Sequence, residues 1–139
     1  MYYALSRNRK GHFHINTNFI HSRSIETMTD SSCKILGITE ALTHVPTVDG
    51  KRFATVFEHR TLSVQIYAPR GSDPQTPHTR DEIYFVAAGN GEYVCGNTRN
   101  EFGPTDLLFA AAGIEHRFEN FSDDLAVWVL FYGPEGGEA

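Results

Sequence analysis

The sequence predicts an all-β domain built as a sandwich, a jelly roll or a barrel. From Lys51 onward, short runs rich in Val, Ile, Phe and Tyr alternate with Gly, Pro, Asn and Asp, which is the pattern of strands and turns. Seven such runs follow one another closely, as in sandwiches and barrels. The chain has 139 residues, of which 40% are hydrophobic, and this length fits one domain with a single core.

The first part of the chain differs in composition from the rest. Residues 1–27 are rich in Asn, Ser, Arg and His and show no sustained apolar period. We expect a disordered tail or a mis-called extension here, with Met28 as the natural start and a single domain over residues 28–139. The segment lacks the continuous apolar run of a secretory signal. A short helical turn is expected in GITEALTHV, residues 37–45.

Strands are expected in seven segments after this turn, near residues 52–59, 62–68, 81–88, 91–96, 106–110, 116–120 and 125–133. AGNG (88–91) and GNTRN (96–100) are interpreted as hairpin turns, because Gly and Asn tolerate positive φ. The last strand, LAVWVLFYG, is apolar on both faces, so both faces should be covered. We expect its outer face to form a homodimer interface; the alternative cover is the N-terminal segment folding back.

Charge and cysteine content restrict the classes of function. The formal net charge of -5 disfavours nucleic acid as a partner, because phosphates require a basic face. No apolar stretch approaches the roughly 18 residues that a spanning helix needs, so no membrane partner is expected. Two cysteines are too few for a disulfide scaffold, and two reduced thiols are typical of a cytoplasmic protein.

Two stretches contain the residues that point to chemistry. In the first, His78 lies four residues before Glu82; in the second, His116 lies between a glycine and an asparagine. At these positions the chain resembles the cupin superfamily, in its small single-domain, conserved-barrel form. The other positions that match its two motifs are Gly89, Gly113 and Asn120. The resemblance covers roughly residues 60–132, with the motifs inside 71–120. It implies a double-stranded β-helix, the jelly-roll barrel, and one divalent metal ion bound by His78, Glu82 and His116.

The sequence departs from the family pattern at three positions. Thr76 stands where the first metal-binding histidine of the family is expected, and a neutral hydroxyl is a weak donor. Ala111 replaces a proline and Thr105 replaces a glycine of the second motif, which affects loop geometry alone. Either the amide oxygen of Gln75 or a water molecule would have to replace the missing ligand.

The remaining donor set still suits a metal. Two imidazoles and one carboxylate offer nitrogen and oxygen ligands for Fe, Mn, Zn, Ni or Co, and three protein ligands leave positions open for substrate or water. The alternative is a vestigial site in which the histidines and Glu82 only form hydrogen bonds. Burying Glu82 without a cation is costly unless it is protonated or paired, which favours the metal.

Several neighbouring residues have two interpretations each. Tyr84 shares a pleat face with Glu82 and either lines the cavity or fills the core. Arg80 either points inward to hold an anionic substrate or lies on the surface. Asn120 should support the loop of the second motif. The cavity walls are expected to be apolar and aromatic, with the candidates Tyr67, Tyr84, Phe109, Phe118 and Trp128.

Three functions are compatible with this interpretation, because the fold alone does not determine the reaction. The first is a metal-dependent enzyme acting on a small organic molecule, in a dioxygenase-type reaction. The second is a metal-dependent isomerase or lyase. The third is a non-catalytic module that binds a small ligand. The sequence favours the first.

Overall fold

The computed structural model describes residues 33–139; the expected tail over 1–27 and the expected start at Met28 lie outside the described residues. This part of the chain contains one short helix, α1 (Ile38–Leu42), at the predicted helical turn. The other regular elements of the described residues are strands: β1 (Phe53–His59), β2 (Leu62–Tyr67), β3 (Asp81–Ala88), β4 (Gly91–Cys95), β5 (Thr98–Phe102), β6 (Leu107–Ala110), β7 (His116–Glu119) and β8 (Ala126–Tyr132). The all-β prediction is therefore confirmed.

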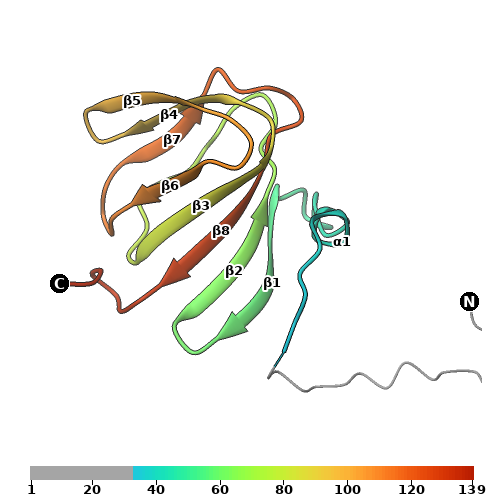
Figure 1. Cartoon of the computed structure of the whole chain (residues 1–139), viewed down its shortest axis with the longest axis horizontal. Coiled ribbons are helices and arrows are strands. Elements are labelled where there is room, and N and C mark those ends of the chain that lie inside the picture. Colours follow the sequence, from blue (N-terminus) through green and yellow to red (C-terminus); the bar gives the residue numbers. More distant parts are fainter. Residues whose placement is uncertain (1–32) are drawn as a thin grey trace, which may run out of the picture. The chain divides into compact units, whose positions relative to one another are not determined.

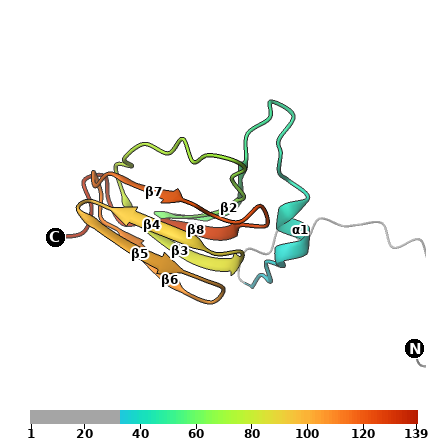
Figure 2. The ribbon, with the colours of Figure 1, turned by 90° about the horizontal axis from the view of Figure 1, so that it is seen from above.

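The strands form two antiparallel sheets (Figures 1 and 2). The larger sheet has the order β1-β2-β8-β3-β6 and the smaller one the order β5-β4-β7. The order is non-consecutive because β8 returns to lie between β2 and β3. This arrangement agrees with the predicted jelly roll, although the two sheets do not close into one continuous barrel.

The hydrophobic core lies between the sheets, because both contribute side chains to one cluster. Strand β8 shows how the sequence builds it: Val127, Val129 and Phe131 alternate along the strand and are buried on its inner face. In the facing sheet, Phe118 of β7 is 2% exposed and its ring lies 5.1 Å from that of Tyr84 on β3. The core therefore fixes β3 and β7 opposite each other.

The outer face of the larger sheet is partly covered. Helix α1 lies beside β2 (Figure 2), where Ala41 of the helix and Ile66 of the strand are buried. Away from the helix, Phe85, Leu107 and Phe109 are 40%, 64% and 49% exposed. The expectation of a second cover over this face stays a prediction.

One predicted turn is wrong in part. The sequence indicates a turn in GNTRN over residues 96–100, but β5 begins at Thr98 and pairs with β4 along its length. The strand escapes detection because four of its five residues are exposed and polar, and only Phe102 reaches the core. Among the described residues no helix is long and apolar enough to cross a membrane.

Residue 89 must be glycine for two reasons: its backbone has a positive φ, and a side chain there would clash with Leu125. It lies in the turn between β3 and β4 with φ of 82°, a region that favours glycine. A Cβ atom at this position would lie 2.6 Å from the Cα atom of Leu125. The turn and the start of β8 can therefore pack this closely only when residue 89 has no side chain.

Candidate metal centre

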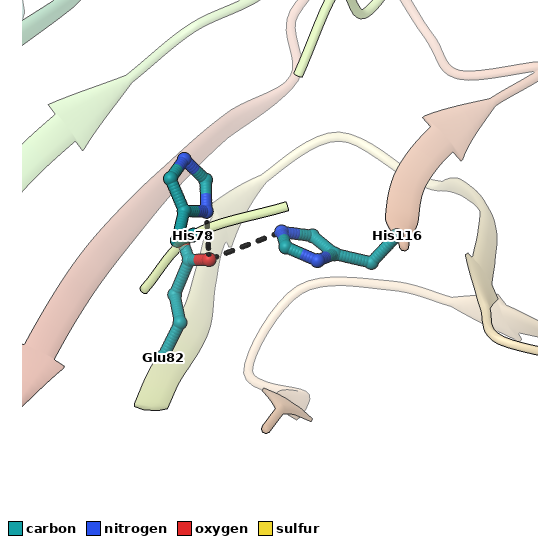
Figure 3. A group of neighbouring side chains, drawn as sticks. All are labelled: His78, Glu82 and His116. Carbon is teal, nitrogen blue, oxygen red and sulfur yellow. Dashed lines mark hydrogen bonds and ion pairs between the residues drawn. The ribbon is translucent and has the colours of Figure 1, made fainter. Parts of the chain in front are cut away.

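The structure brings the three predicted metal ligands together from three separate elements (Figure 3). Glu82 is the second residue of β3, in register with Phe131 on the neighbouring β8. His116 is the first residue of β7 in the facing sheet, and His78 lies in the loop between β2 and β3. One ligand-type atom of each residue lies within 4.8 Å of the others. The Glu82 and His116 side chains are 1% exposed, whereas that of His78 is 31% exposed.

Backbone contacts hold the two loops that carry the histidines. The N–H of Gly113 donates to the carbonyl of His78 at 2.7 Å, so the β6–β7 loop is tied to the β2–β3 loop. Gly113 has φ of 78°, and a Cβ atom there would meet nothing within 4 Å. Its role is therefore conformational: glycine lets the loop turn so that the N–H faces His78.

Asp81 points away from Glu82, as expected for neighbours in a strand. Its Oδ1 accepts the N–H of Ala112 at 2.9 Å, and its Oδ2 accepts the N–H of Glu138 at 2.9 Å. The same strand thus presents one carboxylate to the site and uses the next to hold the β6–β7 loop from behind.

Asp73 is a half-buried organiser that the sequence did not reveal. Its two carboxylate oxygens accept hydrogen bonds from the Tyr67 hydroxyl at 2.6 Å, the Phe118 N–H at 2.7 Å and both the N–H and the side-chain amide of Gln75. Because Phe118 lies on β7 and Gln75 precedes His78, Asp73 connects the His78 loop to the strand that begins with His116. No local motif signals this role, because two of the partners lie on strands: Tyr67 on β2 and Phe118 on β7.

The orientation of the His116 ring leaves one nitrogen available as a ligand. Nδ1 lies 2.8 Å from the carbonyl oxygen of Ile114, and because a carbonyl only accepts, Nδ1 carries the proton in that bond. Nε2 is then the ring nitrogen that faces the site. It lies 3.0 Å from Glu82 Oε2, but the contact lacks hydrogen-bond geometry. Both His116 Nε2 and Glu82 Oε1 are buried without a hydrogen-bond partner among the described residues.

The charges of Glu82 and the two histidines depend on one another. Burial alone raises the pKa of Glu82, but contacts with His116 and His78 outweigh it and the net pKa is lowered. The largest single influence on the pKa of His116 is burial, which lowers it. The Glu82 contact and the Ile114 carbonyl together outweigh burial, so the net pKa is raised. The carboxylate is therefore charged, and the site favours a positive charge beside it.

These residues fit a divalent cation. The donor set is two imidazole nitrogens and one carboxylate, a combination used for Fe, Mn, Zn and Ni. A cation between His116 Nε2 and Glu82 would satisfy the two buried atoms that have no partner among the described residues. The Ile114 carbonyl behind His116 is the kind of support that fixes a ligating histidine.

Gln75 and Thr76 both line the cavity beside the site, Gln75 half-buried and Thr76 exposed. The Gln75 amide oxygen accepts the Tyr84 hydroxyl at 2.6 Å, and its NH₂ group donates to Asp73 at 2.7 Å. Tyr84 itself is fully buried in the core, and burial followed by the Glu82 charge raises its pKa well above the usual range. Gln75 therefore already has partners for its oxygen and its NH₂ group, and it orients the Tyr84 hydroxyl.

A cavity of about 660 Å³ opens beside Glu82 and His78. Of the expected aromatic walls, Tyr67 lines it, whereas Tyr84 and Phe118 belong to the core. The expectation that Phe109 and Trp128 belong to the wall is wrong. Phe109 is in register with Ile83, and Trp128 alternates with Val129, so both lie on the outer face of the sheet.

Arg80 and Asn120 are placed away from the metal cluster. The Arg80 guanidinium donates to the Thr61 carbonyl at 2.6 Å and lies over the Phe131 ring, so it does not enter the cavity. Asn120 follows the end of β7 opposite to His116 and donates its amide to Glu92. The expected support of the His116 loop by Asn120 is therefore wrong, because Asp81 and Gly113 perform it.

Comparison with known proteins agrees with this fold and site. The sequence profile of the family described as Cupin domain matches residues 63–132, half of the chain. The chain therefore belongs to the cupin family, as the motif residues predicted. An uncharacterized protein of Streptomyces coelicolor is 36% identical over 78 residues, which cover 55% of this chain and 74% of that protein.

The described domain is similar to solved structures, among them the following two. A cupin-2 domain-containing protein from Shewanella frigidimarina matches with a TM-score of 0.56 at 10% identity, covering 71% of this chain and 95% of that one. The DMSP lyase DddQ from Ruegeria pomeroyi matches with a TM-score of 0.51 at 28% identity. That match covers 59% of this chain and 47% of the lyase, so the present chain spans about half of the lyase's length.

Proposed function

We propose that this chain is a metal-dependent enzyme that acts on a small organic molecule, with one divalent cation bound by His78, Glu82 and His116. The observation that carries the proposal is the pair of buried ligand-type atoms, His116 Nε2 and Glu82 Oε1, that have no hydrogen-bond partner in the described chain. Proteins rarely retain such atoms in a core unless a ligand or an ion satisfies them.

The first candidate reaction is of the dioxygenase type. Two histidines and one carboxylate with open positions are the pattern of non-haem iron oxygenases. When bound, the ion supplies a Lewis acid or a redox centre. The residues of this chain supply the rest: Glu82 provides the negative charge, the Ile114 carbonyl orients His116, and the aromatic core excludes water behind the site.

The second candidate is a lyase reaction, and a specific observation supports it. The solved structure with 28% identity is a DMSP lyase, and the similarity extends over 59% of this chain. The same donor set can polarise a substrate oxygen without a change of redox state, in which case a redox-inert ion suffices.

The two candidates differ in their need for oxygen. The full chain would be reconstituted with Fe²⁺, Mn²⁺ or Zn²⁺ and incubated with a metabolite extract, with and without O₂, and depletion would be followed by mass spectrometry. An oxygenase depletes a compound only with Fe²⁺ and O₂, whereas a lyase works anaerobically with Mn²⁺ or Zn²⁺. Each activity should disappear in Glu82→Gln. Binding of a small ligand without any turnover would contradict the enzyme proposal and leave a binding module.

A further inference from the structure

The cavity beside the metal cluster has a charge opposite to that of the whole chain. Three cationic side chains line it, Lys51, Arg52 and Arg70, against one carboxylate, Glu82. The complete chain, in contrast, has a formal net charge of -5. Lys51 is neutralised by Asp49, which lies 2.8 Å away. Arg52 and Arg70 form no ion pair with any described residue.

The two arginines are anchored by carbonyl groups, which leave donors free. Arg52 Nε donates to the Ala68 carbonyl at 2.7 Å. Arg70 Nη1 donates to the carbonyls of Pro69 at 2.7 Å and Leu125 at 3.1 Å. A guanidinium has five N–H donors, so each group retains N–H bonds that these contacts do not use. The two guanidiniums lie close together because they bind the carbonyls of consecutive residues, Ala68 and Pro69. Burial, followed by repulsion from Arg70, lowers the pKa of Arg52.

The arginines and the metal cluster line the cavity at different rows of the larger sheet. Arg52 immediately precedes β1, where Phe53 is in register with Tyr67, and Tyr67 with Val127 of β8. Glu82 is in register with Phe131, four residues further along β8. At a strand rise of about 3.4 Å per residue, the two rows are about 14 Å apart. The wall between them is apolar and includes Phe53, Tyr67, Val129 and Phe131.

We propose that Arg52 and Arg70 bind the carboxylate of an elongated organic acid, whose apolar body lies along this wall and whose other end reaches His78 and Glu82. This inference rests on the proposed function, since it names the substrate class of the same cavity. An arginine fork binds a carboxylate through two parallel hydrogen bonds, and two unneutralised guanidiniums at one cavity end favour an anion. The apolar wall selects for hydrocarbon next to that anion.

The test uses 4-phenylbutyrate and its neutral amide, 4-phenylbutyramide, as probes. Binding to the full chain would be measured by isothermal titration calorimetry, on metal-free and on Zn²⁺-loaded protein. We expect the acid to bind at least about tenfold more tightly than the amide in both forms, as charge-assisted hydrogen bonds predict. Arg52→Gln and Arg70→Gln should each reduce this preference, and the double variant should abolish it.

Control variants show whether a lost preference for the acid comes from the missing arginine or from unfolding of the protein. Arg60→Gln removes one exposed arginine from the β1–β2 turn, outside the cavity lining, and should keep the preference. Arg52→Lys retains the charge without the fork and should recover part of the preference, which a merely unfolded variant would not do. Thermal melting of each variant checks the fold.

Three results would overturn the inference. One is equal affinity for acid and amide; another is an unchanged preference in the double variant. The third is no binding of the acid at millimolar concentration. A preference that appears only with Zn²⁺ and survives the double variant would place the carboxylate on the metal, which also contradicts the inference. Because the metal-free arm needs no cation, a failure of the metal proposal leaves this test intact.

Discussion

At the scale of single residues, metal binding depends on how each ligand side chain is oriented as well as on its residue type. His116 can act as a ligand because the Ile114 carbonyl holds Nδ1 and leaves Nε2 facing the site. Glu82 can remain charged in the core because two imidazoles face it. Asp73 holds the residues behind this arrangement, and it is the residue whose loss should be felt most widely.

Replacing Asp73 by asparagine tests that role with little change in shape. The NH₂ group of the new side chain would face at least one donor that now meets a carboxylate oxygen, and this leaves a buried donor unsatisfied. We expect the free energy of unfolding to fall by about 2 kcal/mol in Asp73→Asn, measured by urea denaturation. Metal affinity should fall as well, because the His78 loop loses its tie to β7. The surface variant Asp123→Asn serves as the control, and equal stability of the two variants would contradict the role given to Asp73.

At the scale of elements, two turns require glycine for different reasons. Gly113 adopts positive φ in open space, whereas Gly89 adopts positive φ and also packs against the backbone of Leu125. A side chain at position 113 would therefore cause backbone strain alone, whereas at position 89 there is no room for a side chain.

Alanine substitutions should separate these two cases. Gly113→Ala should lower the free energy of unfolding by about 1–2 kcal/mol, the usual strain of a left-handed residue. Gly89→Ala should lower it by about 3 kcal/mol or more, because overpacking is added to strain. Gly103→Ala is the control, since a Cβ atom there meets nothing within 4 Å and its φ is not positive. Urea denaturation showing Gly113→Ala to be as damaging as Gly89→Ala would contradict this ranking.

Sequence patterns predicted most of the elements because most strands here are rich in apolar and β-branched residues and are bounded by turn residues. The strands near 62–68, 81–88 and 125–133 combine β-branched and aromatic residues with clear turns, and each is present within a residue or two. Strand β5 was missed because TRNEF has one buried residue and no alternation. Its place depends on pairing with β4, which is a tertiary effect.

The metal cluster was predicted by spacing, whereas its surroundings were not. His78, Glu82 and His116 match a motif, and the fold brings them together. Asp73, Arg52 and Arg70 belong to no motif, and their roles arise from contacts between segments that are distant in the sequence. The error for the two aromatic residues of the outer face has a simpler origin, since sequence alone did not determine which pleat face points inward.

At the scale of the whole molecule, the outer face of the larger sheet carries exposed apolar side chains. Phe85, Leu107 and Phe109 are exposed there, next to the half-buried side chains of Ile83, Trp128 and Leu130, which share the face by register. None of these residues is charged, so two copies of the face can meet without charge conflict. Exposed patches of this kind commonly mark interfaces, and most homo-oligomers are two-fold symmetric.

We therefore expect the full chain to form a homodimer through this face. Size-exclusion chromatography with light scattering should give twice the mass of the chain. Leu107→Glu should shift the mass toward the monomer, because it places a charge in the interface. Val48→Glu is the control: Val48 is an exposed apolar residue like Leu107 but lies in the α1–β1 loop, so the dimer should persist. A parent protein that is monomeric at all concentrations would leave the N-terminal segment as the alternative cover and refute the dimer.

The central claim is that His78, Glu82 and His116 bind one divalent cation, and metal content tests it most directly. The full chain would be purified without an affinity tag, reconstituted, dialysed and measured by ICP-MS, beside His116→Ala and the exposed-histidine control His59→Ala. We expect about one ion per chain in the parent and the control, and loss of the ion in His116→Ala. No metal in the parent after reconstitution, or equal metal in His116→Ala and the control, would contradict it.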